Sequence, residues 1–508
     1  MIALPLLSIL SAVLVTGTVR DPSGAGISGA SVYIRGTDIF CVSAADGRFE
    51  LAGTASGGAT LVAAHAGFRA TERHIILTDS PLTIDLTLEI EPHAERVDVA
   101  AASVSPPPSS AAPLQLDPLD IYRTPGTDGD LMRAVQMMPG VSKVDEGAGL
   151  YVRGGDVSET ATYLDHAFLY HPYRYETPTG GFFGAVDPYL ISGLSLSTGA
   201  FPARYGDALS GVLELTGLGP PPRESLYANL GLGTASASLA LPLGEHIAVR
   251  FSANQSLSRL LFDLNPTDQH FSKLPSSTDL NLSLYADAGS FGRFKFSAFT
   301  DQEQVGVETQ QNAFTGILNS SSRNRLFSLG WQKKFHDWLL EVTASLAAFH
   351  ESAALGVLDL ASSDSGQRLR LDLSRRLAQW TFRAGADLER HRALSNGVTP
   401  IHGGDLAGLE GTRPLTVDQD AWRSAAYFEA ERVLGRFRLN AGVRSDRFQA
   451  LRALTVDPRA SITYSLTARQ RLRAAWGLYH QAPSPEYLNT AYGNPRLPPM
   501  RAAHYGRL

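Results

Sequence analysis

Cysteine is almost absent from this sequence of 508 residues, in which Cys41 stands alone. A single thiol excludes any disulfide within the chain. A basic excess is also missing, because 44 Lys and Arg face 50 Asp and Glu, giving a formal charge of -6. This balance argues against a surface that binds nucleic acid or another polyanion. No His-x-x-Glu pair occurs, so a zinc site of the peptidase type is not expected, and no cofactor is predicted.

Long hydrophobic runs are lacking as well. The longest covers residues 2–15, which is shorter than the ~20 residues that a membrane-spanning helix requires. Any residence in a membrane must therefore come from strands. The run is typical of the apolar part of a signal peptide, which we place at residues 1–14. However, no Lys or Arg precedes Arg20, and the second half of the run also fits a buried strand over residues 12–19.

The first region after this run, residues 15–90, consists of short β-prone stretches separated by turn sequences such as PSGAG and AADG. This pattern predicts a small β-sandwich. Residues 91–118 follow, with a centre of Pro, Ser and Ala that cannot bury enough apolar surface to fold. Their start, ERVDVAA at residues 95–101, is β-prone. It either pairs with a sheet edge of another protein or simply ends the sandwich.

Residues 119–217 mix helical and strand patterns. DLMRAVQMMPGV predicts a helix that is capped by Asp130 or Thr127 and ends at Pro139-Gly140. LYVRGG and ATYLDHAFLY are typical of strands. We therefore predict a compact α/β domain here.

The C-terminal region, residues 222–508, alternates apolar and polar residues over long stretches. Trp380 and Leu388, for example, share one face of their stretch, and Asp387 and Glu389 share the other. A soluble sheet also alternates in this way, but runs of ten or more residues exceed the usual five or six.

The connections in this region also alternate in length. Short turns are predicted near residues 244–246, 289–292, 336–337, 378–379, 434–435 and 468–470. Longer loops are predicted near residues 265–277, 308–323, 356–365 and 395–420. Together with five Trp residues that all lie in this region, the pattern predicts a transmembrane β-barrel with about 12 strands. A lumen of that size needs a filler, which residues 119–217 would supply.

The sequence resembles the TonB-dependent outer-membrane receptors, preceded by a carboxypeptidase regulatory-like domain. The first domain is similar through GTVRDPSGAGISGASVYI, ADGRF and HAGF. The next is similar through LMRAVQMMPGV, LYVRGGDVSETATYLDHAFLYHP and residues 181–215, and the last through AGVRSDRF, residues 456–483 and NPRLPPMRAAHY. The resemblance implies a mainly β chain with a β-sandwich, an α/β plug domain and the N-terminal part of a large antiparallel transmembrane β-barrel.

This resemblance implies an importer in the cell outer membrane, with a periplasmic N-terminal domain, and not an enzyme. An extracellular ligand would bind above the plug, and the energy-transducing protein TonB would grip a TonB box and remodel the plug. The ligand class stays open among oligosaccharide, peptide, siderophore and cobalamin. The regulatory-like domain favours a saccharide or peptide, with a surface lipoprotein as a further partner beside outer-membrane lipid.

Two sets of residues match family features. The TonB-box candidate comprises Glu95, Arg96, Val97, Asp98, Val99, Ala100 and Ala101. Asp98 departs from the apolar residue that is common there. The residues that match plug turns are Arg153, Gly154, Gly155, Asp165, Arg204, Tyr205 and Gly206. All of them except Asp165 are interpreted as mainly structural, with a share in contacts between plug and barrel. His166 stands where the family usually has glycine after the aspartate.

A cluster of rings and one cation follows this turn. It comprises His166, Tyr170, His171, Tyr173, Arg174 and Tyr175. A metal or catalytic site would need convergent ligands or a base beside a nucleophile, which one segment without cysteine does not offer. Two other readings remain open: side chains that stack on a ligand, and side chains that contact the barrel wall.

The resemblance also raises a question of length. The family's barrel has about 22 strands, so a chain with about 12 is expected to be a fragment or a truncated product that would not insert stably alone. Two other classes of protein remain as alternatives to the importer. One is a passive porin or adhesin barrel with an accessory sandwich, and the other is a secreted, soluble β-rich protein.

Overall fold

The computed structural model describes two stretches of the chain, which are interrupted by short gaps. The stretches are residues 13–89 and 114–507, and the gaps are residues 36, 38, 54–56, 66–67, 69, 79, 128, 144–146, 177–179, 232–233, 265–269, 312–313, 403–404, 468–469 and 490–492. Residues 1–12 of the predicted leader and the whole TonB-box candidate lie outside the described residues. The chain divides into two compact units, Met1–Ala100 and Ala101–Leu508. No helix in the described stretches is long and apolar enough to cross a membrane.

The first unit is a sandwich of two small sheets. One sheet has the order β4-β1-β7, with β8 beside β1, and the other has the order β3-β2-β5-β6. The strands are β1 (Val13–Arg20), β2 (Ser31–Ile34), β3 (Phe40–Val42), β4 (Arg48–Gly53), β5 (Gly57–Ala64), β6 (Thr71–Leu77), β7 (Leu82–Thr83) and β8 (Leu86–Thr87). Val15, Leu51 and Leu61 are among the residues in the core between the sheets. Because β1 begins at Val13, the second half of the apolar run forms a strand, as the second interpretation of this run expected, and the leader at residues 1–14 stays a prediction.

The second unit contains an α/β part that we call the inner unit, residues 114–217. Its five-stranded sheet has the order β13-β12-β17-β16-β9, in which only β12 and β17 run parallel. The strands are β9 (Leu114–Leu116), β12 (Thr160–Leu164), β13 (Ala167–Phe168), β16 (Ile191–Ser197) and β17 (Gly211–Gly217). Two-stranded ribbons accompany the sheet: β10 (Val141–Ser142) with β11 (Tyr151–Val152), and β14 (Tyr173–Arg174) with β15 (Phe183–Gly184). Four short helices complete it: α1 (Pro118–Arg123), α2 (Leu131–Gln136), η1 (Val157–Glu159) and η2 (Pro188–Leu190).

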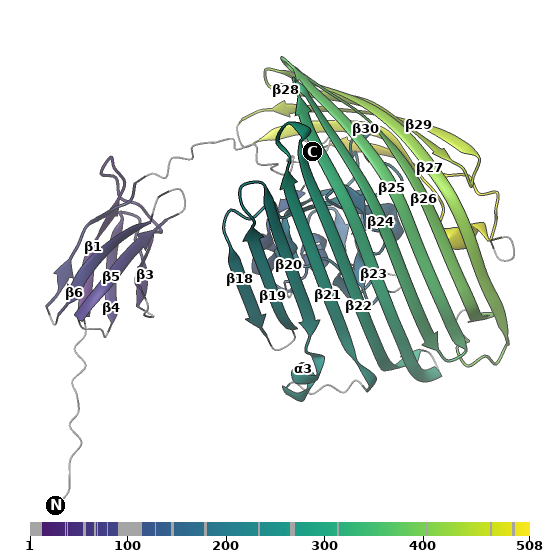
Figure 1. Cartoon of the computed structure of the whole chain (residues 1–508), viewed down its shortest axis with the longest axis horizontal. Helices are drawn as coiled ribbons and strands as arrows, with labels where there is room; N and C mark the ends of the chain where they lie inside the picture. The colour runs from purple at the N-terminus through teal and green to yellow at the C-terminus, as the bar shows by residue number, and fades with distance from the viewer. Residues whose placement is uncertain are drawn as a thin grey trace, which may run out of the picture. The chain divides into compact units, whose positions relative to one another are not determined.

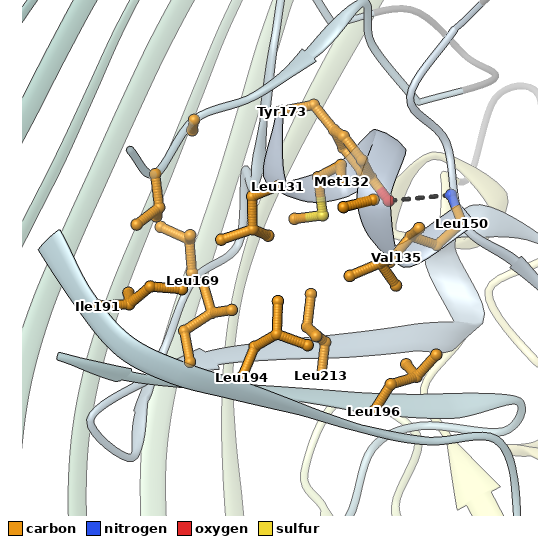
Figure 2. Close-up of a cluster of buried hydrophobic side chains, with 14 of the residues drawn as sticks. Leu131, Met132, Val135, Leu150, Leu169, Tyr173, Ile191, Leu194, Leu196 and Leu213 are labelled. Atoms are coloured by element: carbon orange, nitrogen blue, oxygen red, sulfur yellow. Dashed lines mark hydrogen bonds between the residues drawn. The ribbon is translucent and has the colours of Figure 1, made fainter. Parts of the chain in front are cut away.

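Helix α2 covers the sheet of the inner unit. Asp130 is its cap, because the carboxylate accepts a hydrogen bond from the Arg133 amide at 2.9 Å. The second oxygen of Asp130 accepts from the Gly184 amide at 2.7 Å, which ties α2 to β15. Burial raises the pKa of this carboxyl group, against the effect of those two amides. Figure 2 shows Leu131 and Val135 of α2 pointing toward Leu194, Leu196 and Leu213 of the sheet.

The remainder of the second unit is a 14-stranded sheet in which every strand pairs with its neighbours in sequence. We call it the wall; Figure 1 shows its long strands curving around the inner unit. The strands are β18 (Ser225–Leu230), β19 (Thr234–Pro242), β20 (Ile247–Ser256), β21 (Phe271–Asp287), β22 (Arg293–Gln311), β23 (Phe314–Phe335), β24 (Trp338–Leu355), β25 (Leu358–Leu377), β26 (Trp380–Pro400), β27 (Thr412–Leu434), β28 (Phe437–Phe448), β29 (Ala453–Ser465), β30 (Arg471–Gln481) and β31 (Met500–Arg507). The short helices α3 (Ser258–Leu264), η3 (Gly289–Phe291) and η4 (Pro485–Leu488) lie in its connections.

The two faces of the wall are inverted relative to a soluble protein. Leu388 is 44% exposed, whereas its neighbours Asp387 and Glu389 are 4% and 5% exposed. The same alternation runs along the other long strands, with apolar residues outside and charged residues facing the inner unit. This inversion is what lipid outside and a polar lumen require, and it excludes the soluble-sheet reading.

The strand count and the loop lengths differ from the prediction. Residues 225–242 form two strands instead of one, and β31 adds another, so the wall has 14 strands instead of about 12. The predicted short turns lie at one end, which we call the short-turn end. At the other, long-hairpin end, most of residues 308–323 and 356–365 is strand, and the predicted loop at residues 395–420 shrinks to 401–411. Strands of 18 to 23 residues are longer than the ~10 that a tilted strand needs to cross a bilayer, so the hairpins continue beyond it.

Candidate functional site between the inner unit and the wall

The buried face of the wall carries a dense group of charged side chains opposite residues 201–207 of the inner unit. Its members are Arg368, Arg370, Asp387, Glu389, Arg423, Glu429, Arg444, Asp446, Asp457 and Arg459, each with 8% exposure or less. They come from β25 to β29 and alternate with outward apolar residues, so the strand period places them on one face. Burying charges is unfavourable unless they are paired. The pairs are therefore the feature that makes this interface stable.

Arg444 is the centre of the group and contacts both parts of the unit. Its guanidinium donates to Asp387 at 3.2 Å and, through Nε, to Asp446 at 2.7 Å. It also donates to the backbone carbonyls of Ala203 and Arg204, each at 3.4 Å. One wall cation thus joins two wall carboxylates to the backbone of the inner unit.

Arg459 makes a second connection of the same kind. Its Nη1 donates to the carbonyls of Pro202 at 2.6 Å and Tyr205 at 2.8 Å. The same guanidinium lies over the Tyr479 ring, 4.2 Å from its centroid. Tyr479 in turn donates to the Phe201 carbonyl at 3.2 Å. Carbonyls that would otherwise be buried without partners are therefore satisfied by the wall.

Gly206 is needed because Arg444 occupies the space where a side chain would begin. A Cβ atom at residue 206 would lie 2.1 Å from Nε of Arg444, far inside van der Waals contact. Tyr205 beside it donates to Glu214 of β17 at 3.1 Å and receives a hydrogen bond from Arg204. The amide of Arg204 also donates to Glu429 of the wall at 3.3 Å. The predicted turn residues 204–206 thus lie at the centre of the contact with the wall.

The other predicted glycine turn lies within the inner unit. Arg153 and Gly154 both have positive φ, 51° and 83°, which Gly154 adopts at low cost. At Gly155 a Cβ atom would meet Ser210 Oγ at 1.8 Å, so a side chain is excluded by close approach. Arg153 donates to the Thr198 hydroxyl at 3.3 Å.

Asp165 and His166 form the two-residue turn between β12 and β13. Their φ angles are 50° and 66°, as in a type I′ turn, which usually prefers glycine at the second position. The Glu214 carboxylate accepts a hydrogen bond from the His166 amide at 3.1 Å. Asp165 reaches the wall through an ion pair with Lys295 at 2.7 Å. His166 therefore adopts the positive φ that this turn requires although it is not glycine.

Residues 170–176 form a second contact region with the wall. Tyr170 donates to Glu389 at 2.5 Å and stacks on the His391 ring, with centroids 4.8 Å apart. The ring of His171 stacks on Phe349. Its Nδ1 lies 2.7 Å from Glu176 and its Nε2 lies 3.1 Å from Asp364 of β25.

The environment of His171 favours the charged ring. Burial alone lowers the pKa of His171, but Glu176 and Asp364 outweigh burial and raise the pKa to about 10. An imidazolium donates from both nitrogens, which matches a carboxylate on each side. His171 is therefore a cationic link between the inner unit and the wall and has no free nitrogen for a metal ion.

The remaining predicted ring residues are also engaged. The hydroxyl of Tyr173 accepts from the Leu150 amide at 3.2 Å inside the core (Figure 2). Arg174 forms ion pairs with Asp279 and Asp301 of β21 and β22. The Tyr175 amide donates to Glu303 at 2.8 Å. The described contacts of residues 166–175 are thus with the wall or the core, and contact with a ligand stays a prediction.

Comparison with known proteins gives the family. A model described as the TonB dependent receptor-like beta-barrel matches residues 252–505, half of the chain. The chain belongs to the TonB-dependent receptor family. A second model, the carboxypeptidase regulatory-like domain, matches residues 14–89. No curated protein sequence matches the chain.

Solved structures of similar fold are also receptors. The ferric enterobactin receptor PfeA of Pseudomonas aeruginosa is 15% identical, with a TM-score of 0.56 over 75% of this chain and 63% of PfeA. The siderophore receptor PirA of the same organism is 17% identical, with a TM-score of 0.53 over 73% and 62%. The FrpB iron transporter of Neisseria meningitidis is 13% identical, with a TM-score of 0.54 over 70% and 62%. This TonB-dependent receptor chain therefore spans less than two thirds of the length of these neighbours, and the likeness carries the fold alone.

Family membership confirms the predicted fold, the predicted location in the outer membrane and the predicted class of transport receptor, each at the level of the family. TonB-dependent receptors are β-barrel proteins of the outer membrane, and they are transport receptors and not enzymes.

The partners of Arg204 and Tyr170 on the wall were not predicted as site residues. Arg444 and Asp446 lie within AGVRSDRF, which was recognised only as a family motif. Charges that recur at every second position opposite apolar residues were the signal that could have found them.

Proposed function

We propose that this receptor imports an extracellular ligand into the periplasm, driven by TonB. The observation that carries the proposal is the polar interface between the inner unit and the wall. Arg444 and Arg459 of the wall donate hydrogen bonds to the inner unit, and Tyr170 of the inner unit donates one to Glu389 of the wall. Groups of this kind exchange their partners for water when two surfaces separate, whereas an apolar interface of the same area would resist separation.

The same observation argues against a passive porin or adhesin. A porin keeps a water-filled lumen, but here residues 170–176 and 201–207 occupy the space beside the charged wall. An inner unit that fills the lumen, and that is bound to the wall by contacts that water can replace, has the properties expected of a gate. In this proposal residues 119–217 act as the plug, and residues 15–90 form a periplasmic domain.

The proposed handle for TonB is the segment 95–101, ERVDVAA. Its β-prone residues would add a strand to a sheet edge of TonB. The Pro- and Ser-containing residues 103–113 that follow would transmit the pull as a slack tether. The ligand remains open among oligosaccharide, peptide, siderophore and cobalamin, and the regulatory-like domain favours a saccharide or peptide delivered by a surface lipoprotein.

The experiment that tests this proposal needs no knowledge of the ligand. The full chain and a variant without residues 95–101 are incubated with the periplasmic domain of TonB, and retention is measured. A deletion of residues 103–109 is the matched control, because it removes the same number of residues from the adjacent tether. We expect only the first deletion to abolish binding. Equal retention of the two deletion variants by the TonB domain would refute the assignment of residues 95–101 as the segment that TonB binds.

A further inference from the structure

A row of polar side chains crosses the inward face of β22, β23 and β24 near the long-hairpin end. The register places Glu303, Ser322 and Glu351 side by side in this row. On the outward face of β24 the residues are apolar from Trp338 to Ala348, and His350 follows. We call these outward apolar residues, together with those level with them on the neighbouring strands, the apolar band. Glu351 lies beyond it, so the row faces the lumen where the hairpins continue past the bilayer.

Glu303 is held in place through one of its two carboxylate oxygens. Oε1 accepts hydrogen bonds from the Ser322 hydroxyl at 2.6 Å and from the Tyr175 amide at 2.8 Å. The residue is only 5% exposed, and its enclosed Oε2 accepts no hydrogen bond from any described residue. Because Ser322 stands between the two glutamates, its bond to Oε1 draws the carboxyl group toward Glu351. A buried oxygen without a donor is unfavourable, so the space between the glutamates suits a donor that comes from outside.

Carboxylates outnumber cations around this space. The carboxylates are Glu176, Asp279, Asp301, Glu303, Glu351 and Asp364, and the cations are Arg174 and His171, with His391 3.7 Å from Asp364. Arg174 is engaged by Asp279 and Asp301, and His171 lies between Glu176 and Asp364. Within the described part of the chain, no ion pair includes Glu303 or Glu351. The two glutamates of the row therefore lack a counterion.

The electrostatics of Glu351 agree with this arrangement. Burial and the carboxylates of Glu176 and Glu303 raise the pKa of Glu351 to about 7, although His171 acts in the opposite direction. A cation among these three carboxylates would stabilise their charged forms. A metal ion does not fit, because no group of three or more His, Cys, Asp or Glu in the described stretches converges closely enough to hold one. An ammonium group is larger and carries three donors, so it can reach carboxylates that are further apart.

We propose that Glu303, Glu351 and Glu176 bind a protonated amine of the imported ligand. The inference rests on the import proposal and adds the charge of the ligand to it. The amine donates to Oε2 of Glu303 and to the carboxylates of Glu351 and Glu176, in charge-assisted hydrogen bonds. Two kinds of ligand carry such an amine: a peptide with a lysine side chain, and an oligosaccharide of amino sugars that are not acetylated. An anionic iron chelate is disfavoured, because it would approach an excess of carboxylates.

The test uses the purified full chain in detergent and two matched pairs of probes. The first pair is the trisaccharide of β-1,4-linked glucosamine and its N-acetylated form. The second is a blocked alanine pentapeptide with lysine at its centre and the same peptide with norleucine there. Affinities are measured by titration calorimetry near neutral pH. We expect wild type to bind at least one aminated probe about tenfold more tightly than its neutral counterpart, as charge-assisted hydrogen bonds would give. The pair with the larger difference identifies the source of the amine.

Glu303→Gln with Glu351→Gln should abolish the preference for the aminated probe, since the amides keep the size of the side chains and remove their charge. The matched control is Glu308→Gln with Asp359→Asn. These two acids are exposed and lie on the outward face of β22 and β25 at the same end, so the preference should remain. The midpoint of heat-induced unfolding shows whether each variant is folded.

Two results would overturn the proposal. One is that wild type binds neither aminated probe more tightly than its neutral counterpart, which includes the case in which neither binds. This comparison needs no variant and decides even if the double glutamine variant does not fold. The other is an undiminished preference in the folded double variant. Retention by TonB is measured without any ligand, so failure of the amine site is distinct from failure of the import proposal.

Discussion

His171 shows how one residue can link two parts of the molecule by its charge. The ring contacts Glu176 in the inner unit and Asp364 in the wall, and the pKa of His171 is raised to about 10. A group whose pKa is raised on folding stabilises the folded state fully below its unfolded pKa, which is about 6.5 for histidine. That contribution declines as the pH rises from there and is lost above about 10.

A first prediction follows for His171→Gln. At pH 6.5 the substitution should destabilise the protein by roughly 3 kcal/mol, because it leaves two carboxylates beside an uncharged amide. The difference from wild type should shrink steadily toward pH 10, where the wild-type ring is losing its proton. The measurement is the midpoint of heat-induced unfolding on gels at several pH values. His350→Gln, at an exposed outward histidine, is the control, and a difference that is the same at every pH would contradict the assignment of charge.

His166 supports a second prediction in the opposite direction. The residue is held at a φ of 66°, where a side chain costs roughly 1 kcal/mol and glycine does not. The backbone hydrogen bond to Glu214 survives the change. His166→Gly should therefore raise the free energy of unfolding by about 0.5–1 kcal/mol. Denaturant titration measures this. A clear loss of stability would show that the imidazole, whose Nδ1 lies 3.4 Å from Glu214, contributes more than the strain costs.

At the scale of elements, the outward and inward faces of the wall were predictable, because successive side chains of a strand point to opposite faces and the apolar set can lie on only one of them. The faces of Trp380 to Glu389 are as the sequence indicates. The β18–β19 hairpin was missed because the sequence of residues 225–242 contains no polar loop that would separate the two strands. The long hairpins were taken for loops because Ser, Gly and Asn residues such as those of SSDSG and LSNG weaken strand propensity. Pairing with long neighbours keeps these residues in strands, and a sequence read strand by strand does not contain that information.

Contacts between the inner unit and the wall could not be predicted from the sequence for a related reason. Arg204 and Glu429 are 225 residues apart, and no local pattern relates them. The sequence indicated that glycines form these turns. It could not show that glycine is required at residue 206 because the Arg444 side chain of the wall occupies the space of a Cβ atom.

The hairpin between β24 and β25 gives the third prediction. Deleting residues 352–361 and closing Glu351 to Ser362 through Asn-Gly keeps a register pair that already exists. The shortened β24 retains 14 residues, or about 34 Å across the membrane at ~45° tilt, which exceeds the ~30 Å hydrocarbon core. Outer-membrane assembly should therefore be preserved.

The control for that deletion removes the same number of residues nearer the short-turn end. Deleting residues 340–344 and 369–373 takes out paired outward residues of the apolar band and should abolish assembly. Membrane fractionation after urea extraction distinguishes the two variants. If neither variant assembles in the membrane, the part of the β24–β25 hairpin beyond the apolar band is itself required for assembly, which would contradict the prediction.

At the scale of the whole molecule, the inner unit is bound to the wall by contacts that water can replace. Covalent attachment should remove that freedom. An ideal Cβ at Gly442 of β28 lies 3.2 Å from Cβ of Ala203, 3.0 Å from the Phe428 carbonyl oxygen and 2.9 Å from Cγ of Glu429. A small shift of β28 and of the Glu429 side chain would bring the Cβ separation to the ~3.5–4.5 Å of a disulfide. Gly442→Cys with Ala203→Cys, in a Cys41→Ser background, should therefore cross-link spontaneously under oxidising conditions.

The fourth prediction concerns the conductance of that variant in planar bilayers. Moderate urea should open a conductance in each single-cysteine variant, as the inner unit leaves the wall. The oxidised double variant should stay closed, and a reductant should restore the behaviour of the single variants. A conductance that opens equally while the disulfide is intact would show that the pathway does not require residues 201–207 to move.

The strands that continue beyond the apolar band have a consequence for proteolysis. Backbone amides in paired strands are inaccessible to proteases, which require an extended segment free of its neighbours. A broad-specificity protease added to intact cells should therefore leave β22 to β25 whole and cut mainly within the three long connections at that end, residues 257–270, 401–411 and 482–499. Surface digestion of this receptor would yield a few large fragments that remain associated in the membrane instead of a ladder of small peptides.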